Sequence, residues 1–206
     1  MDSPKGADGF NYTRFYGAIA PVYGLGLALL PVWRHYTQSV LPWLPPRGRV
    51  LEIGPGPGVL LTRLSRRDDT VVGLDLSPEM LGECRQRLQR AGLPQHLVNA
   101  NAGQLPLASA TFDAVVLTFA FSAFPDGAGV LAEIARVLRP GGVVALVDAC
   151  LPSDGNWAGV QLAHLWERFG DFMRDEAALM RAIGLEIVEC KEFGVFNSVR
   201  LTVGQK

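Results

Sequence analysis

Hydrophobic and polar positions follow one another along the chain in a pattern that predicts strands alternating with helices. An apolar run from Val50 to Ile53 indicates a buried strand, glycines follow at positions 54, 56 and 58, and an apolar segment resumes at Val59. Residues 70–76 indicate a second strand, which ends in Asp75 and Leu76. A strand, a glycine turn and a helix form the entry unit of a doubly wound parallel sheet. The pattern therefore predicts an α/β fold.

The later elements are predicted by the same periodicities and by capping residues. Ser77 and Pro78 begin a helix, because serine caps a helix N-terminus well and proline suits the first helical position. Gly92 ends that helix, and Asp175 is a candidate cap for a later one. Residues 151–170 form a variable insert. Further strands are expected at 97–98, 113–118, 143–147, 185–190 and 198–203, and further helices at 59–65, 129–138 and 171–183.

Composition narrows the class of protein. Apolar residues make up 49% of the 206 residues and charged residues 19%, which is typical of a globular chain. The net charge of −1 provides no basic field for nucleic acid. The three cysteines, Cys84, Cys150 and Cys190, are far apart and odd in number, so we expect small buried residues in a reducing compartment and no metal site. With no signal peptide visible, we expect a cytoplasmic protein.

The glycine turn favours a particular ligand chemistry. Its spacing is Gly-x-Gly-x-Gly, whereas a dinucleotide pyrophosphate is bound by Gly-x-Gly-x-x-Gly. Two prolines inside the turn remove N–H groups that a phosphate would need. Glu52 precedes the turn and suits a ligand with a cationic amino group. Asp75 lies twenty-one residues after Gly54, the spacing at which a carboxylate reaches ribose hydroxyls. An adenosine ligand without phosphates fits these features best.

This combination resembles the class I S-adenosylmethionine-dependent methyltransferases. The motif Glu52-x-Gly-x-Gly-x-Gly58, with Asp75 after the next strand, is supported by segments 101–107, 112–118 and 131–142 in the family's order. The resemblance covers residues 50–147 and is greatest to the branch that methylates quinone precursors, phospholipid head groups and small metabolites. It implies a three-layer, Rossmann-like fold with a mostly parallel seven-stranded sheet and one antiparallel edge strand.

The resemblance also implies a set of cofactor-binding residues. Tyrosines of an N-terminal cover close over the methionine end, and an asparagine stands where the family has an aspartate near the adenine. That asparagine accepts through its carbonyl oxygen, although it can instead cap its own loop. The expected cofactor residues are Tyr16, Tyr23, Glu52, Gly54, Gly56, Gly58, Asp75, Leu76, Asn101, Ala102 and Thr118.

The N-terminal segment is expected to be a helical lid, residues 1–44, on a methyltransferase domain, residues 45–206. Residues 10–44 are rich in aromatics, which a lid or an amphipathic helix buried on the sheet would both explain. Residues 18–33 carry no charge, but glycines and prolines interrupt them and they are shorter than the roughly 20 residues of a spanning helix. We expect at most weak peripheral contact with a membrane surface.

The acceptor side is expected to be apolar. Relatives often place histidine or asparagine near the transferred methyl, where this chain has phenylalanines. The expected acceptor residues are Phe119, Phe121, Phe124 and Trp157. Candidate bases are Tyr16, Asp126, Asp148, His35 and His164. Because a sulfonium is already a good leaving group, we expect catalysis by positioning, without a dedicated protein base.

These features predict a methyltransferase that acts on an apolar or amphiphilic small molecule, such as a quinone precursor or another hydrophobic metabolite. An ethanolamine phospholipid is the alternative acceptor, with Arg174 and Arg200 as candidates to hold its phosphate. A Rossmann oxidoreductase is disfavoured by the glycine spacing and by Glu52. A cofactor-binding module without catalysis remains the alternative from another class. No nucleic-acid partner is expected.

Overall fold

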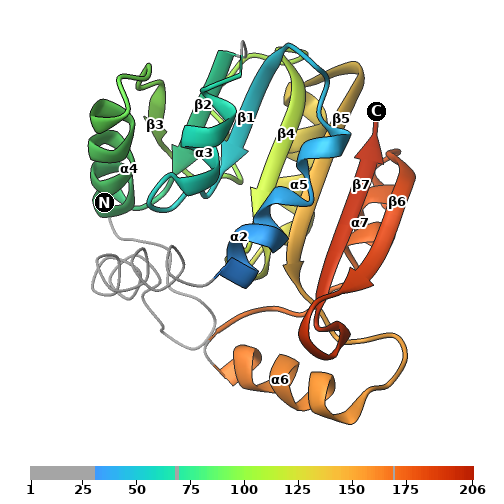
Figure 1. Cartoon of the computed structure of the whole chain (residues 1–206). Helices are drawn as coiled ribbons and strands as arrows, with labels where there is room; N and C mark the ends of the chain where they lie inside the picture. Colours follow the sequence, from blue (N-terminus) through green and yellow to red (C-terminus); the bar gives the residue numbers. More distant parts are fainter. Residues whose placement is uncertain (1–30, 68–69, 169) are drawn as a thin grey trace.

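The computed structural model describes residues 31–67, 70–168 and 170–206. Its centre is a seven-stranded sheet in the order β3-β2-β1-β4-β5-β7-β6 (Figure 1). Six strands run in one direction, and β7 lies antiparallel between β5 and β6. The predicted doubly wound sheet of seven strands is thereby confirmed, and its antiparallel strand is the second strand from the edge.

Most predicted elements are present with small shifts at their ends, whereas the strand expected at 143–147 runs from Leu138 to Ala149. Ser77 Oγ accepts a hydrogen bond from Met80 N at the start of α4, and Gly92 follows its last turn at φ +66°. The strands β1 to β7 are Arg49–Ile53, Thr70–Asp75, Leu97–Asn99, Phe112–Thr118, Leu138–Ala149, Glu186–Phe193 and Val199–Gln205. The helices α2 to α7 are Pro31–Gln38, Val59–Leu64, Pro78–Arg90, Gly127–Val137, Trp157–Arg168 and Glu176–Ala182. Short 3-10 turns, η1 to η3, occupy Leu41–Trp43, Phe121–Ala123 and Val195–Asn197.

Two regions of the chain differ from the prediction. The expected insert contains helix α6, whose first turn is fixed by a hydrogen bond from Gly159 N to Asn156 Oδ1. Helix α7 begins at Glu176, later than the expected 171, because Asp175 is its N-cap and accepts from Ala178 N. The cap prediction is confirmed, and the residues before it form a loop.

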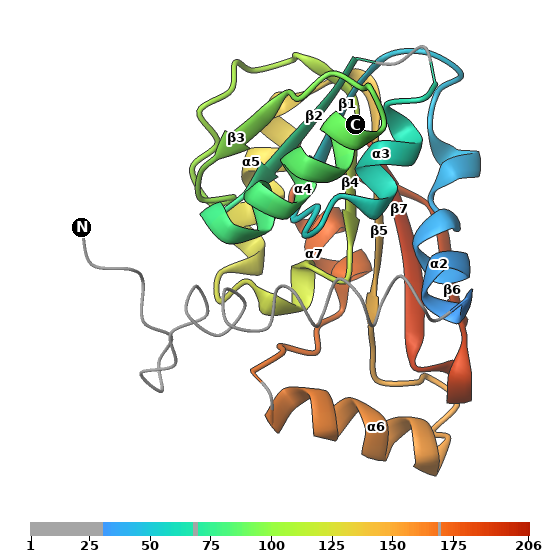
Figure 2. The ribbon, with the colours of Figure 1, turned by 60° about the vertical axis from the view of Figure 1, so that its left-hand side comes forward.

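Helices cover both faces of the sheet. Figures 1 and 2 show α2, α3 and α4 on one face and α5 and α7 on the other. Each face buries its own apolar cluster, one containing Leu61 and Val116 and the other Leu131 and Leu146, all at most 1% exposed. Helix α6 lies apart, beyond the carboxyl ends of the parallel strands (Figure 1). This arrangement leaves the ends of β1, β2 and β4 free to form a site.

The three cysteines differ in exposure. Cys84 and Cys150 are buried, and burial raises the pKa of each thiol to about 12. Cys190 on β6 is exposed, so the expectation that all three are buried is wrong for this residue. A side chain on β6, one of the two edge strands, has only one neighbouring strand, which explains the exposure. Cys84 lies under the glycine turn, where a Cβ on Gly58 would lie 2.5 Å from its Sγ.

The described part of the N-terminal segment packs on the sheet. Tyr36, Val40 and Leu44 are buried in the cluster on the α3–α4 face. The Tyr36 hydroxyl accepts a hydrogen bond from Val195 N at 3.1 Å, which joins α2 to η3. The predicted lid tyrosines, Tyr16 and Tyr23, lie outside the described residues. No helix in the described ranges is long and apolar enough to cross a membrane.

Candidate functional site

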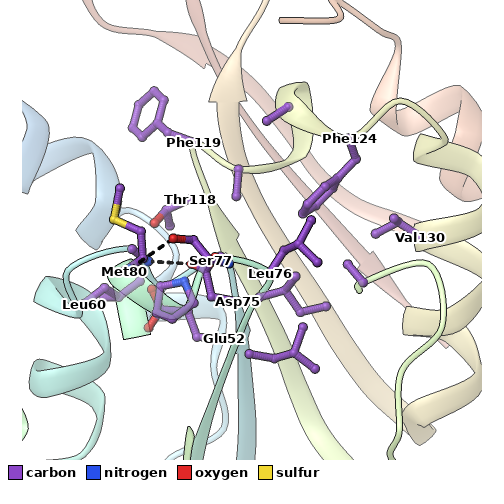
Figure 3. Close-up of a pocket in the computed structure, with 18 of the residues that line it drawn as sticks. Glu52, Leu60, Asp75, Leu76, Ser77, Met80, Thr118, Phe119, Phe124 and Val130 are labelled. Atoms are coloured by element: carbon purple, nitrogen blue, oxygen red, sulfur yellow. Dashed lines mark hydrogen bonds between the residues drawn. The ribbon is translucent and has the colours of Figure 1, made fainter. Parts of the chain in front are cut away.

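A cavity of about 520 Å³ lies at the carboxyl ends of β1, β2 and β4 (Figure 3). Its volume is in the range of small-molecule sites. The strand order reverses between β1 and β4, so the crevice is at the switch point where open α/β sheets bind ligands. Its walls come from α2, the glycine turn, the end of β2, residues 100–104 and the loop between β4 and α5.

The three glycines of the turn have different surroundings. Gly54, Gly56 and Gly58 all have positive φ, at +69°, +52° and +78°. A Cβ on Gly54 would lie 2.6 Å from the Cβ of Ala120, so that position is closed by packing. A Cβ on Gly56 would meet no atom within 4 Å. Gly54 and Gly56 line the cavity, whereas Gly58 is packed against α4 and does not.

Two carboxylates lie together in the cavity wall. Glu52 lies on β1 between Gly73 and Val116 and is 1% exposed. Burial, with a contribution from the neighbouring Asp75, raises the pKa of Glu52 to about 8. Its Oε2 atom has no hydrogen-bond partner among the described residues. A buried carboxylate oxygen is costly unless it is paired, so this wall is suited to a cationic or hydrogen-bond-donating ligand.

Asp75 is held in place by backbone donors. Its Oδ2 accepts from Gly56 N at 3.2 Å and its Oδ1 from Ser77 N at 2.9 Å. Burial raises the pKa of Asp75, and these hydrogen bonds oppose the rise. Figure 3 shows Asp75 beside Glu52 among the residues that line the cavity. The glycine turn and the end of β2 are therefore joined through one carboxylate.

The predicted adenine region lines the same cavity. Leu76 is 40% exposed there, so its side chain offers an apolar surface to a ligand in the cavity. Ala102 is part of the wall. Asn101 also lines the cavity, but its Oδ1 accepts from Gly103 N at 2.8 Å. This asparagine therefore caps its own loop, which is the alternative to binding the adenine. One lone pair of its side-chain oxygen is used in that hydrogen bond.

The acceptor-side predictions divide into two groups. Phe119 and Phe124 line the cavity, as does Thr118, which was predicted as a cofactor residue, and Figure 3 shows the two rings at different points of its border. Phe121 does not line it, because its ring is 1% exposed in the core. Trp157 also lies outside it, 76% exposed on α6. Spacing alone could not separate the phenylalanine that faces the core from its neighbours.

Only one candidate base among the described residues lines the cavity. Asp126 does so, although its Oδ1 caps α5 by accepting from Gly129 N at 2.8 Å. Asp148 is buried and accepts from the backbone N and the hydroxyl of Ser122. His164 pairs with Glu167 on α6, and His35 is exposed outside the cavity. Tyr16 lies outside the described residues.

The two arginines expected to hold a phosphate have other roles. Arg200 is nearly buried between Glu176 and Glu192, at 3.0 and 2.8 Å. Arg174 donates to the carbonyl oxygens of Phe124 and Pro125, which fixes the loop between β4 and α5. Neither lines the cavity, so this prediction is wrong.

The sequence analysis missed the residues that α2 contributes. Trp33, Arg34 and Thr37 line the cavity from this helix. The ring of Trp33 lies edge-on to Phe119, with centroids 4.1 Å apart. Trp33 and Thr37 are four positions apart, which indicates a shared helix face, but nothing in the sequence indicated which partner that face meets. Met80, on α4, was missed for the same reason.

Comparisons with known proteins define the class. A family model described as a methyltransferase domain matches residues 51–146. A phosphatidylethanolamine N-methyltransferase of Cereibacter sphaeroides is 39% identical over 118 residues, 56% of this chain and 58% of its own length. A demethylmenaquinone methyltransferase of Deinococcus radiodurans is 33% identical over 174 residues, 80% of this chain and 72% of its own. The methyltransferase solved with the Haloferax volcanii Trm112 methyltransferase activator is 21% identical, with a TM-score of 0.75 over 93% of this chain and 94% of its own.

The chain belongs to the class I S-adenosylmethionine-dependent methyltransferases. The chain spans 58% of the length of the phosphatidylethanolamine N-methyltransferase that it matches. S-adenosylmethionine is the cofactor of the family, and the cavity fits it: the unpartnered Glu52 oxygen suits an ammonium group, and Gly56 leaves room for a ligand against the backbone. In the ranges that the structure describes, no cluster of side chains could hold a metal ion.

The raised pKa of Glu52 predicts pH-dependent binding. Before binding, the pKa of about 8 keeps Glu52 mostly protonated at pH 6. An ammonium group beside it favours the carboxylate, so binding of S-adenosylhomocysteine releases a proton and tightens as the pH rises. The dissociation constant should fall by up to about tenfold per pH unit from pH 6 until the pH approaches this pKa. Calorimetry in two buffers of different ionisation enthalpy measures the released proton.

The matched variant for this prediction is Glu52→Gln. It keeps the shape of the side chain but cannot titrate, so both the proton release and the pH slope should disappear. A wild-type profile as flat as that of the variant would show that Glu52 does not meet the cationic group.

Proposed function

We propose that this protein transfers the methyl group of S-adenosylmethionine to an apolar or amphiphilic small molecule. The observation that carries the proposal is the buried Glu52–Asp75 pair in the cavity wall, with Glu52 Oε2 unpartnered among the described residues. An oxidoreductase that binds a dinucleotide pyrophosphate would gain nothing from a carboxylate at this position, since two negative groups repel.

Each wall of the cavity has a proposed role. Glu52 pairs with the amino group of the cofactor, and Asp75 accepts hydrogen bonds from the ribose hydroxyls. Leu76 provides an apolar face for the adenine, beside Asn101 and Ala102. The bound sulfonium supplies an electrophilic methyl group. Trp33 and Phe119 exclude water from the acceptor side and hold the acceptor in line with that methyl group, and such positioning can contribute about 7–11 kcal/mol.

The acceptor class is proposed from the apolar wall and from the relatives. Trp33, Phe119 and Phe124 provide aromatic surface, which suits a quinone precursor or another hydrophobic metabolite. The phosphatidylethanolamine N-methyltransferase relative supports an ethanolamine phospholipid as the alternative. Among the candidate bases that the structure describes, Asp126 is the one that lines the cavity. Its carboxylate accepts a hydrogen bond from Gly129 N at the start of α5, which favours a structural role. We therefore propose positioning catalysis without a dedicated base.

The test combines binding with turnover. Calorimetry should show binding of S-adenosylhomocysteine and none of NAD or ATP. Cofactor labelled in the methyl group should then transfer the label to demethylmenaquinone or, for the alternative, to phosphatidylethanolamine in detergent. Binding without transfer to any acceptor tested would favour a non-catalytic cofactor-binding module, and binding of NAD alone would overturn the proposal.

We further propose that residues 1–44 act as a lid on the domain formed by residues 45–206, in a cytoplasmic protein with at most weak membrane contact. The position of Trp33, Arg34 and Thr37 in the cavity wall supports the lid, because it places α2 over the site. The burial of Tyr36 supports a packing role for the same helix. The two roles meet in one helix, since the rings of Trp33 and Tyr36 lie edge to face with centroids 6.2 Å apart.

A further inference from the structure

A second concave surface lies beside the cofactor cavity. It is a groove of about 550 Å³ across α2, α3 and α4, and it borders the first cavity through four shared residues. Two of these, Arg34 and Thr37, are on α2, and two, Val59 and Leu60, are on α3. A ligand that reaches the acceptor side of the cavity past α2 would therefore have this groove next to it.

The groove is strongly basic, in contrast to the chain as a whole. Five arginines line it and one acidic residue, Glu83, whereas the complete chain has a net charge of −1. No ion pair joins any of the five to a carboxylate of the described ranges. The five residues are Arg34, Arg63, Arg66, Arg87 and Arg90, which we call the arginine groove.

Two of these arginines are held in position by neighbouring groups. Arg87 Nε donates to the carbonyl oxygen of Pro57 in the glycine turn at 2.8 Å. Arg90 donates to Gln86 Oε1 at 3.2 Å. Both bonds use part of a guanidinium that has five N–H donors, so donors remain for a ligand. Arg87 also joins the groove directly to the cofactor turn.

We propose that the arginine groove binds the phosphate of a soluble amphiphilic acceptor whose reacting end enters the cofactor cavity. This inference rests on the proposed methyl transfer and narrows its substrate class to phosphate-bearing amphiphiles. Guanidinium groups bind phosphate oxygens through paired, charge-assisted hydrogen bonds, and several guanidiniums around one concave surface match a multiply charged anion. The concave shape favours a compact anion over a flat lipid surface.

The probe is inorganic pyrophosphate, titrated by calorimetry at constant ionic strength with sodium chloride as the balancing salt. The wild-type protein should bind it, and Arg63→Gln/Arg66→Gln should weaken binding by about tenfold or more, because two charge-assisted contacts are lost. The matched control is Arg168→Gln/Arg181→Gln, which removes the same charge from exposed positions on α6 and α7. The control should bind pyrophosphate as the wild type does.

The outcomes separate this inference from the proposed function. Binding of S-adenosylhomocysteine by all three proteins tests the cofactor site independently, since neither double variant touches that cavity. If both double variants bind pyrophosphate equally weakly, the attraction is a general effect of charge, and the proposed phosphate site in the groove is overturned. Binding of vesicles of phosphatidylcholine and phosphatidylglycerol, without binding of pyrophosphate, would overturn it in favour of a membrane-facing surface.

Discussion

Replacement of Gly56 by valine should weaken binding of S-adenosylhomocysteine by about a hundredfold or more, which amounts to about 3 kcal/mol. The side chain would project where no protein atom lies within 4 Å, in the wall of the cofactor cavity. It would therefore occupy ligand volume without disturbing the core. Calorimetry on the folded variant measures the loss.

Backbone strain needs its own control, because Gly56 has φ +52° and a valine there costs about 1–2 kcal/mol of stability. Gly92 provides it: its φ is +66°, a Cβ there also meets nothing within 4 Å, and it lies at the far end of α4. Gly92→Val should lower the thermal midpoint similarly and leave cofactor binding unchanged. If both variants bind normally, Gly56 does not face the cofactor.

Replacement of Asp75 by alanine should weaken cofactor binding by about 10- to 150-fold. Two charge-assisted hydrogen bonds to the ribose would be lost, at a cost of about 1.5–3 kcal/mol. Part of the loss comes from the turn itself, since Gly56 N and Ser77 N both donate to this carboxylate. Asp75→Asn, which keeps one oxygen acceptor, should fall between the wild type and the alanine variant in calorimetric titrations.

The matched carboxylate for this prediction is Asp113. It accepts from Arg49 N and pairs with Arg139 at 2.7 Å, near the amino end of β4 and outside the cavity. Asp113→Ala should lower stability and leave the dissociation constant unchanged. If the Asp75 variant binds the cofactor as tightly as the Asp113 variant does, Asp75 does not bind the ribose hydroxyls.

The sequence predicted the features that depend on local chemistry. The first strand, the glycine turn and the Ser77 cap were found because each needs particular residue types at fixed spacing. The positions of Glu52 and Asp75 in one cavity followed from the parallel pairing of β1 with β2, which the alternation of elements implies. Local pattern and topology together were sufficient to predict that Glu52 and Asp75 lie together in the cavity wall.

Features that depend on tertiary packing were not predictable in this way. Phe121 and Phe124 share a short turn, yet one faces the core and the other the cavity. The sequence left Arg200 as a candidate to bind a phosphate, but in the folded chain it forms ion pairs with Glu176 and Glu192. Trp33 lines the cavity because of where α2 packs on the sheet, and the periodicity of the sequence does not predict that position.

The unequal exposure of the three cysteines has a practical consequence for experiments. The thiolate is the nucleophile, so a thiol whose pKa burial raises to about 12 reacts slowly at neutral pH. A maleimide fluorophore should therefore attach to Cys190 in preference to Cys84 and Cys150, without removal of any native cysteine. Because Cys190 pairs with Thr202 of β7 at the sheet edge, such a dye would sit on a fixed strand. It would serve as a reference point for energy-transfer distances to labels introduced on α2.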